Sequence, residues 1–219
     1  MQIDYQNIDT VSVRKNPFIA LLGRSGTYYL KNNQILFSMA SSTTYELLHA
    51  LSTHYESEQN VYRTGFSIHP FFKALNEGYT ELFASRIEER PLHSYLNHVK
   101  FVRLVEVLFD SKEAMMQAYF DNNLELLVQN MSEYMSSEDA VYLLLKEDAA
   151  LRKQMIGTNT NMDYIPQRLA LYQAVVTNCQ DFDKLERFLE VASEDKELQT
   201  ALRVTGVVSS IKETISRSR

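Results

Sequence analysis

Residues 93–109 read HSYLNHVKFVRLVEVLF and form the most apolar stretch of the part of the sequence with helical periodicity. On a helix, the polar residues that recur at every third position make one narrow, slanting stripe: Asn97, Lys100, Arg103 and Glu106. The rest of the surface is covered by Tyr, Leu, Val and Phe, each contributing roughly 1.5 to 3 kcal/mol when buried. We therefore predict a central helix with a solvated polar stripe. The alternative is that the basic residues of the stripe line a pocket.

Cap signals divide the sequence after residue 109 into a series of short helices. Each apolar run follows a residue that can cap a helix N-terminus, or a proline that suits the first turn. Gly157 suits the left-handed residue that ends a helix. Short connections favour antiparallel neighbours, and the irregular spacing of the starts argues against a fixed helical repeat. The predicted starts are Asp110 with Glu113, Asn122 or Asn123, Ser137, Pro166, Asp181 and Ser193.

Helical periodicity also extends toward the N-terminus of the central stretch. Thr43 and Glu46 have the spacing of a capping box, and the apolar residues that follow predict a helix over residues 43–57. Pro70 suits the first turn of a second helix, and Pro91 marks another start.

Residues 17–40 have a different pattern, in which short β-favouring runs are separated by turn residues. The runs are residues 18–22, 27–30 and 34–37. Gly26 supplies positive φ for the first turn, and Asn32 with Asn33 suits a two-residue hairpin turn. Three runs joined by two tight turns predict a small antiparallel meander.

These patterns predict a mainly α protein of the α+β class. We expect a multi-helix bundle, or an irregular stack of helical hairpins, with a small N-terminal antiparallel β-meander. The meander is assigned to residues 1–41 and the helical domain to residues 42–219, packed as one continuous globular unit.

Composition limits the possible partners and compartment. The net charge of −6 argues against a protein that neutralises nucleic acid phosphates. No run approaches the roughly 18 apolar residues of a membrane span, and the N-terminus lacks the basic and apolar segments of a secretory signal. We expect a soluble, cytoplasmic protein, and specialised export stays open. Cys179 is the single cysteine, which excludes an internal disulfide; we interpret it as a half-buried packing residue.

Catalytic and metal motifs are missing from the sequence. The histidine pairs His49/His54 and His93/His98 are five residues apart, whereas two ligands on one helix face need a spacing of about four. There is no Gly-x-Ser-x-Gly elbow, and Cys179 has no basic neighbour in sequence to activate it. We therefore expect no catalytic residues, no metal and no cofactor.

Residues 23–26, GRSG, raise the question of a ligand-binding loop. A phosphate-binding loop leads into a helix, whereas this one leads into the strand-like TYYL, so we interpret it as a bend. Anion binding by Arg24 is the alternative. The longest polar connection, residues 157–165, is a second candidate, with a plain surface crossover as its alternative. The apolar and basic residues of the tail, 207–219, suggest a helix that docks on the body or on a partner.

Thirteen Tyr and eight Met residues are more than a helical core easily absorbs, and both types are enriched at protein interfaces. Our leading hypothesis is a non-enzymatic interaction or adaptor module, a subunit or regulator in a larger complex, with protein partners and unknown oligomeric state. The alternative is a small-molecule sensor or enzyme with a pocket between the meander and the helices. The candidate pocket or interaction residues are Arg24, Tyr28, His49, His98, Arg103, Asn159, Asn161 and Tyr164.

Overall fold

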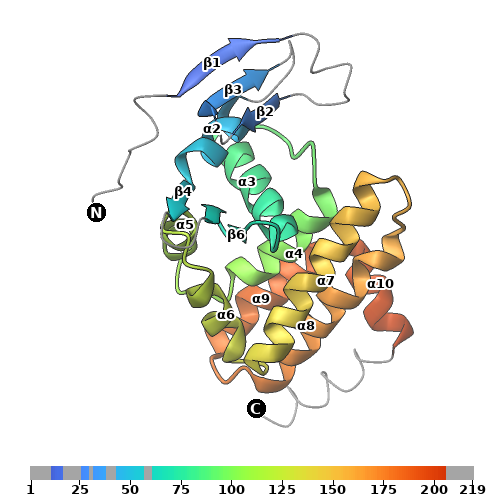
Figure 1. Ribbon diagram of the computed structural model, residues 1–219. Helices are drawn as coiled ribbons and strands as arrows, with labels where there is room; N and C mark the ends of the chain where they lie inside the picture. Colours follow the sequence, from blue (N-terminus) through green and yellow to red (C-terminus); the bar gives the residue numbers. More distant parts are fainter. Residues whose placement is uncertain (1–10, 17–25, 30–31, 38–42, 57–60, 206–219) are drawn as a thin grey trace. The chain divides into compact units, whose positions relative to one another are not determined.

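The structure, a computed structural model, describes residues 11–16, 26–29, 32–37, 43–56 and 61–205 (Figure 1). Over these residues the chain is mainly helical with two small sheets near the N-terminus, which confirms the predicted α+β class. Backbone contacts divide the chain into two compact units. Unit 1 comprises residues 1–99 and 116–124, and unit 2 comprises residues 100–115 and 125–219. The predicted boundary at residues 41 and 42 lies outside the described residues.

The described helices follow one another through most of the chain. They are α2 (Thr43–Leu51), α3 (Lys73–Ile87), α4 (Leu96–Glu106), α5 (Lys112–Phe120), α6 (Leu124–Ser132), α7 (Ser137–Met155), the 3-10 turn η2 (Asn161–Asp163), α8 (Ile165–Asn178), α9 (Phe182–Glu194) and α10 (Lys196–Val204).

The first sheet is mixed, so the prediction of a purely antiparallel meander was wrong. Its strands, β1 (Ser12–Lys15), β2 (Gly26–Tyr29) and β3 (Gln34–Phe37), lie in the order β1-β3-β2. β2 pairs antiparallel with β3, whereas β1 pairs parallel with it. The last three side chains of β1 are exposed, so the strand does not need alternating apolar residues. Its sequence, SVRK, therefore carried no strand signal. The predicted run at 18–22 lies outside the described residues.

The turn residues of this sheet behave differently from one another. Asn33 has φ 45°, as predicted for a turn residue between β2 and β3, and residues 30 and 31 lie outside the described residues. Gly26 lies inside β2 and does not have positive φ, which corrects its assignment to a turn. A Cβ at Gly26 would lie 2.8 Å from Glu46 Cγ. Close packing against α2 therefore explains this glycine.

The predicted helix over residues 43–57 was too long. α2 ends at Leu51, and a second sheet follows, with β4 (Thr53–Glu56), β5 (Val61–Thr64) and β6 (Ser67–Ile68) antiparallel in that order. Cross-strand pairs favour the hairpin over a longer helix. The rings of Tyr55 and Tyr62 are 4.8 Å apart, and the hydroxyls of Thr53 and Thr64 are 2.9 Å apart.

Several predicted helix starts were displaced. α3 begins at Lys73, after the left-handed Phe72, so Pro70 does not occupy its first turn. No helix begins at Pro91, because α4 starts at Leu96. At three helices the observed N-cap residue differs from the predicted one by one or two positions. Ser111 takes the place of Asp110, Ser136 that of Ser137, and Asp195 that of Ser193. In each case the hydroxyl or carboxylate that reaches the free backbone N–H groups defines the start.

Other helix ends match the prediction. Pro166 lies in the first turn of α8, and the Asp181 side chain accepts a hydrogen bond from Lys184 N at the start of α9. Gly157 has φ 69° and ends α7, where Gly157 N donates to Gln154 O and Thr158 N donates to Lys153 O. These two bonds form a Schellman motif.

The core of unit 1 is aromatic. The ring centroids of Phe66, Tyr79 and Tyr119 lie 5.0 to 5.6 Å apart, within the range of favourable aromatic pairs. Most residues of α3 are buried, including polar ones, so this helix is enclosed on nearly all sides. The sequence did not predict this, because nothing in the pattern of apolar residues indicates that Glu77 and Glu81 are buried.

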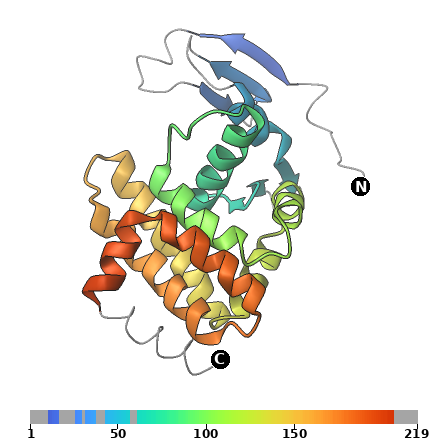
Figure 2. The ribbon, with the colours of Figure 1, turned by 180° about the vertical axis from the view of Figure 1, so that it is seen from behind.

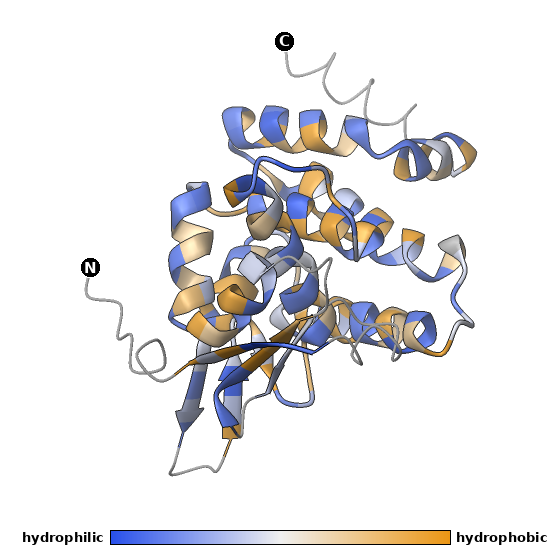
Figure 3. Cartoon of the chain, turned by 90° about the horizontal axis from the view of Figure 1, so that it is seen from above, coloured by the Kyte–Doolittle hydropathy of each residue, from blue (hydrophilic) through white to orange (hydrophobic). Residues whose placement is uncertain are grey.

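The core of unit 2 lies among α7, α8, α9 and α10. α8 contacts the other three, and in the view from behind α9 and α10 lie in front of α7 and α8 (Figure 2). The prediction that residues 93–109 contribute a buried helix is confirmed, because Phe101, Val102 and Leu104 of α4 are at most 1% exposed. Hydrophobic and hydrophilic residues alternate around the helices in both units (Figure 3).

Candidate functional site

A buried polar cluster joins α2 to α3 in unit 1. Tyr45 and His49, one helical turn apart on α2, both reach the Glu77 carboxylate of α3. The Tyr45 hydroxyl donates to Glu77 Oε2, and His49 Nε2 lies 3.3 Å from the same oxygen. Asn76 Nδ2 lies 3.4 Å from His49 Nδ1, and Lys73 Nζ lies 3.8 Å from Glu77 Oε1. We call these five residues the His49 cluster.

The protonation of the His49 cluster follows from its burial and charges. Burial alone raises the pKa of Glu77, but the His49 imidazole and the hydrogen bonds from His49 and Tyr45 outweigh it and lower the pKa to about 2. Burial alone lowers the pKa of His49, but the Glu77 carboxylate more than compensates, so the pKa is raised. Burial, followed by the Glu77 charge, raises the pKa of Tyr45 well above its usual value. Glu77 is therefore a carboxylate that accepts bonds from a protonated phenol and an imidazole.

The structure brings two of the sequence candidates into one row of rings. His49 contacts Tyr45 edge to face at 4.8 Å, Tyr45 stacks on Tyr95 at 6.2 Å, and Tyr95 lies 6.4 Å from the buried His98. Sequence spacing alone could not bring the two histidines together. Tyr28 is engaged elsewhere, because its hydroxyl donates to Asn33 Oδ1 at 2.8 Å within its own hairpin.

The remaining sequence candidates are not part of the His49 cluster. Arg24 lies outside the described residues. Arg103 of α4 forms a partly exposed ion pair with Glu194 at 2.7 Å in unit 2. Tyr164 is buried, and its hydroxyl donates to Gln154 Oε1 at 3.0 Å, so it is a core residue. Asn159 is exposed in the connection after α7, and Asn161 belongs to η2.

Sequence reasoning missed a second buried cluster, which is centred on Arg168 in unit 2. Arg168 has no exposed surface, pairs with Asp195, and lies 3.2 Å from Glu197 Oε2. Its Nε donates to Tyr164 O at 3.3 Å, and Lys100 Nζ contacts Glu197 at 2.7 Å. The sequence did contain a signal for the burial of Arg168. Arg168 lies at helical spacing from Tyr164, Leu171 and Val175, and all four positions are buried on one helix face. This cluster fixes the junction of α9 and α10.

Both clusters are held by protein groups that pair with one another, as expected for polar groups that stabilise a fold. In the His49 cluster the Tyr45 hydroxyl donates to the Glu77 carboxylate, and the raised pKa of Tyr45 favours the phenol over the more nucleophilic phenolate. Across the part of the chain that the structure describes, no group of three or more His, Cys, Asp or Glu residues is arranged to hold a metal ion. Cys179 is half-buried, and its Sγ donates to Asp181 O at 3.3 Å.

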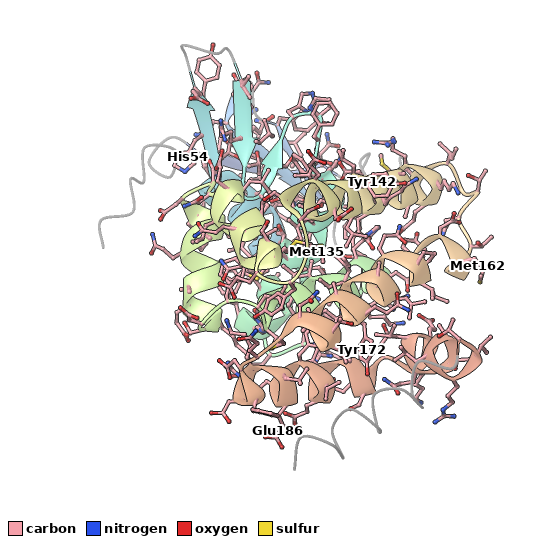
Figure 4. All side chains as sticks on the ribbon, turned by 90° about the horizontal axis from the view of Figure 1, so that it is seen from below. His54, Met135, Tyr142, Met162, Tyr172 and Glu186 are labelled. Atoms are coloured by element: carbon pink, nitrogen blue, oxygen red, sulfur yellow. The ribbon has the colours of Figure 1, made fainter. Side chains whose placement is uncertain are left out.

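The outer face of α7 is the strongest candidate for a functional surface. Tyr142, Leu145 and Ile156 are 37% to 72% exposed, and with the partly exposed Ala149 they form the α7 stripe. Successive residues of a helix are about 100° apart, so these four positions fall within about 60° of one another. The exposed Met155 and Met162 lie at the end of α7 and in η2. Figure 4 shows Tyr142 along α7 and Met162 in the connection that follows.

The inner face of the same helix carries charge. Glu147 and Asp148 of α7 are buried, whereas Tyr142 and Leu145 are exposed. The helix predicted to start at Ser137 carries Val141, Leu144 and Leu145 as its apolar residues, which assigns Leu145 to the core. That assignment was wrong, because six consecutive apolar residues, 140–145, do not reveal which side of the helix is buried. The helix therefore exposes Tyr142 and Leu145 although it buries two carboxylates together with its other apolar residues.

Comparisons with known proteins return no match to a protein-family model, a curated protein or a solved structure. In the described part of the chain, no helix combines the length and apolar character that crossing a membrane requires. The candidate site is therefore argued from its own geometry.

Proposed function

We propose that this protein is a non-enzymatic protein-binding module, a subunit or regulator of a larger complex, and that the α7 stripe is its binding surface. The observation that carries the proposal is the outward exposure of Tyr142, Leu145 and Ile156 along one face of a helix. A contiguous exposed apolar patch often marks an interaction site, whereas single exposed apolar residues are a normal feature of protein surfaces. Tyr and Met, both present here, are enriched at the centres of protein interfaces.

The energetics support the same interpretation. An apolar side chain that passes from water into an interface contributes roughly 1.5 to 3 kcal/mol, so three or four of them supply a useful part of a binding free energy. Lys146 Nζ lies 4.9 Å above the Tyr142 ring, and this cation–π contact holds the ring against the helix. A ring held in place loses less entropy on binding than a free one.

The experiment compares three forms of the protein as affinity baits in lysate of its source cells. These are the wild type, Leu145→Glu, and the control Phe182→Glu, which alters an exposed apolar residue of α9. We expect wild type and control to recover the same partner and Leu145→Glu to lose it. The partner is identified by mass spectrometry, purified, and titrated against all three forms. Equal affinity for all three would contradict the proposal.

A second candidate function is small-molecule binding in unit 1. It is favoured by the His49 cluster, which places an imidazole, a phenol and a carboxylate together on α2 and α3. A metabolite that binds there raises the melting temperature of the wild type. The same shift should be absent in Tyr45→Phe and present in the control Tyr55→Phe, which alters an exposed tyrosine of β4. If the ligand raised the melting temperature of Tyr45→Phe and Tyr55→Phe equally, it would bind outside the His49 cluster.

A further inference from the structure

We infer that the partner on the α7 stripe is a second copy of this chain, whose α7 packs antiparallel against the first around a twofold axis beside Leu145. This inference rests on the proposed function and identifies the partner. It is an isologous interface, in which each contact occurs twice.

Charge along α7 is arranged for antiparallel pairing. The exposed acids Glu138 and Asp139 lie in its first turn, and the exposed bases Arg152 and Lys153 lie in its last turn. A parallel pair would place like charges together at each end, whereas an antiparallel pair places Glu138 between the two bases of the other chain. Lys153 also pairs with Asp163 of its own chain, and the adjacent Arg152 is a second basic residue for Glu138 of the other chain.

Side-chain size is matched in the same register. When Glu138 lies opposite Lys153, Tyr142 lies opposite Ala149, so the largest residue of the stripe meets the smallest. Leu145 then packs beside its own copy near the axis. At the ends, Ile156 lies opposite Met135, which is partly exposed just before α7. Charge, size and apolar character are thus complementary in one register, with the helices about 8–10 Å apart.

The predicted dimer is weak. One helix pair buries less than the roughly 1,600 Å² of a standard interface, so we expect a dissociation constant on the order of 10 µM. In sedimentation equilibrium, the apparent mass should rise from 25.4 kDa toward twice that value as the concentration increases from about 1 to 100 µM.

The first experiment measures this rise for the wild type, Leu145→Glu and the control Phe182→Glu. We expect the wild type and the control to dimerise alike. Leu145→Glu replaces the apolar contact beside the axis with two carboxylates and should weaken dimerisation at least tenfold, because Lys146, which lies opposite position 145 in this register, is held over the Tyr142 ring of its own chain. Circular dichroism checks that each variant is folded. A wild type that stays monomeric throughout, or a Leu145→Glu variant that dimerises like the wild type, overturns the inference.

The second experiment tests the register. Cys179→Ser removes the single cysteine, and into this background Glu138→Cys and Lys153→Cys are introduced in separate proteins, one of them carrying a size tag. After mixing and mild oxidation, the 138–153 disulfide should form at least tenfold faster than 138–138 or 153–153. In the antiparallel pair, two copies of position 138 are about 22 Å apart along the axis. Preferential 138–138 linkage overturns the inference.

The two proposals fail in different ways. A monomeric wild type whose heterologous partner is lost in Leu145→Glu would overturn the second-copy assignment and leave the binding module standing. A protein whose self-association and partner capture are both unaffected by Leu145→Glu would overturn both.

Discussion

At the scale of single residues, unit 1 depends on a few buried polar atoms around Gly65. Asn76 Oδ1 accepts from Phe66 N at 3.2 Å, and Asn122 Nδ2 donates to Ser52 O at 2.8 Å and Gly65 O at 3.1 Å. The backbone at Gly65 has φ 53°, in the left-handed region. These bonds satisfy backbone groups that would otherwise be buried without partners.

We expect Gly65→Ala to destabilise the protein by about 2 to 5 kcal/mol. Left-handed backbone costs a residue with a Cβ roughly 1 to 2 kcal/mol, and overpacking a core adds typically 1 to 3 kcal/mol. The added Cβ would overlap the Tyr119 ring and Asn76 Oδ1. Urea unfolding followed by circular dichroism measures the loss.

The matched control is Gly157→Ala. Gly157 also has positive φ, 69°, but nothing lies within 4 Å of an added Cβ. Only the backbone term applies, so the loss should be about 1 kcal/mol. Equal losses at the two positions would show that packing around Gly65 is looser than described.

At the scale of elements, buried ion pairs connect helices that are distant in sequence. His49 and Glu77 join α2 to α3, and Arg168 with Asp195 joins α8 to α10. Glu81 of α3 holds the chain before α4, accepting from the two terminal guanidinium nitrogens of Arg90 and from His93 N at 2.8 Å. Breaking such a pair leaves an uncompensated buried charge, which is strongly destabilising.

The His49–Glu77 pair should make stability depend on pH. Because the pKa of His49 is raised, its contribution is complete below the ordinary value of 6.5 and is lost as pH rises through the folded-state pKa. Because the pKa of Glu77 is lowered to about 2, its contribution is complete above 4.5 and is lost as pH falls toward 2. The pair therefore stabilises most between about pH 4.5 and 6.5.

Glu77→Gln should lower the unfolding free energy by about 3 kcal/mol at pH 5.5 and by clearly less at pH 9, where the wild type has already lost the His49 contribution. Urea unfolding at both pH values measures the difference. Glu125→Gln, which removes an exposed acid of α6, serves as the control and should have little effect at either pH. A loss at Glu77 that does not change with pH would contradict the ion-pair interpretation.

Arg168→Leu should cost about 3 to 5 kcal/mol, because the buried Asp195 loses its countercharge. Lys100→Met is the matched control, since Lys100 contacts Glu197, another partner of Arg168, from a site about one-third exposed. An exposed pair contributes at most about 1 kcal/mol, so the control should lose no more than that. Similar losses in the two variants would mean that Arg168 is reached by water.

At the scale of the whole molecule, the sequence predicted the class of fold and much of the helical order, but only part of the candidate site. The ends at Pro166, Asp181 and Gly157 were predictable because capping chemistry acts within a few residues. The strand β1 was not predictable, because it pairs in parallel with β3, which begins 19 residues after the end of β1. His49 was a sequence candidate, but its partner Glu77, 28 residues later in the chain, was not.

The amino-acid sequence by itself determined those helix ends that depend on local caps, such as Pro166, Asp181 and Gly157, and that apolar residues suffice for a helical core, since caps and periodicity are local. Only the tertiary structure decided which side of α7 faces inward and which charges are buried. A charged group is stable inside only when its partner is delivered from elsewhere, as Asp195 is to Arg168 across 27 residues. That pairing cannot be read from either segment alone, and neither can the exposure of Tyr142 and Leu145 on α7.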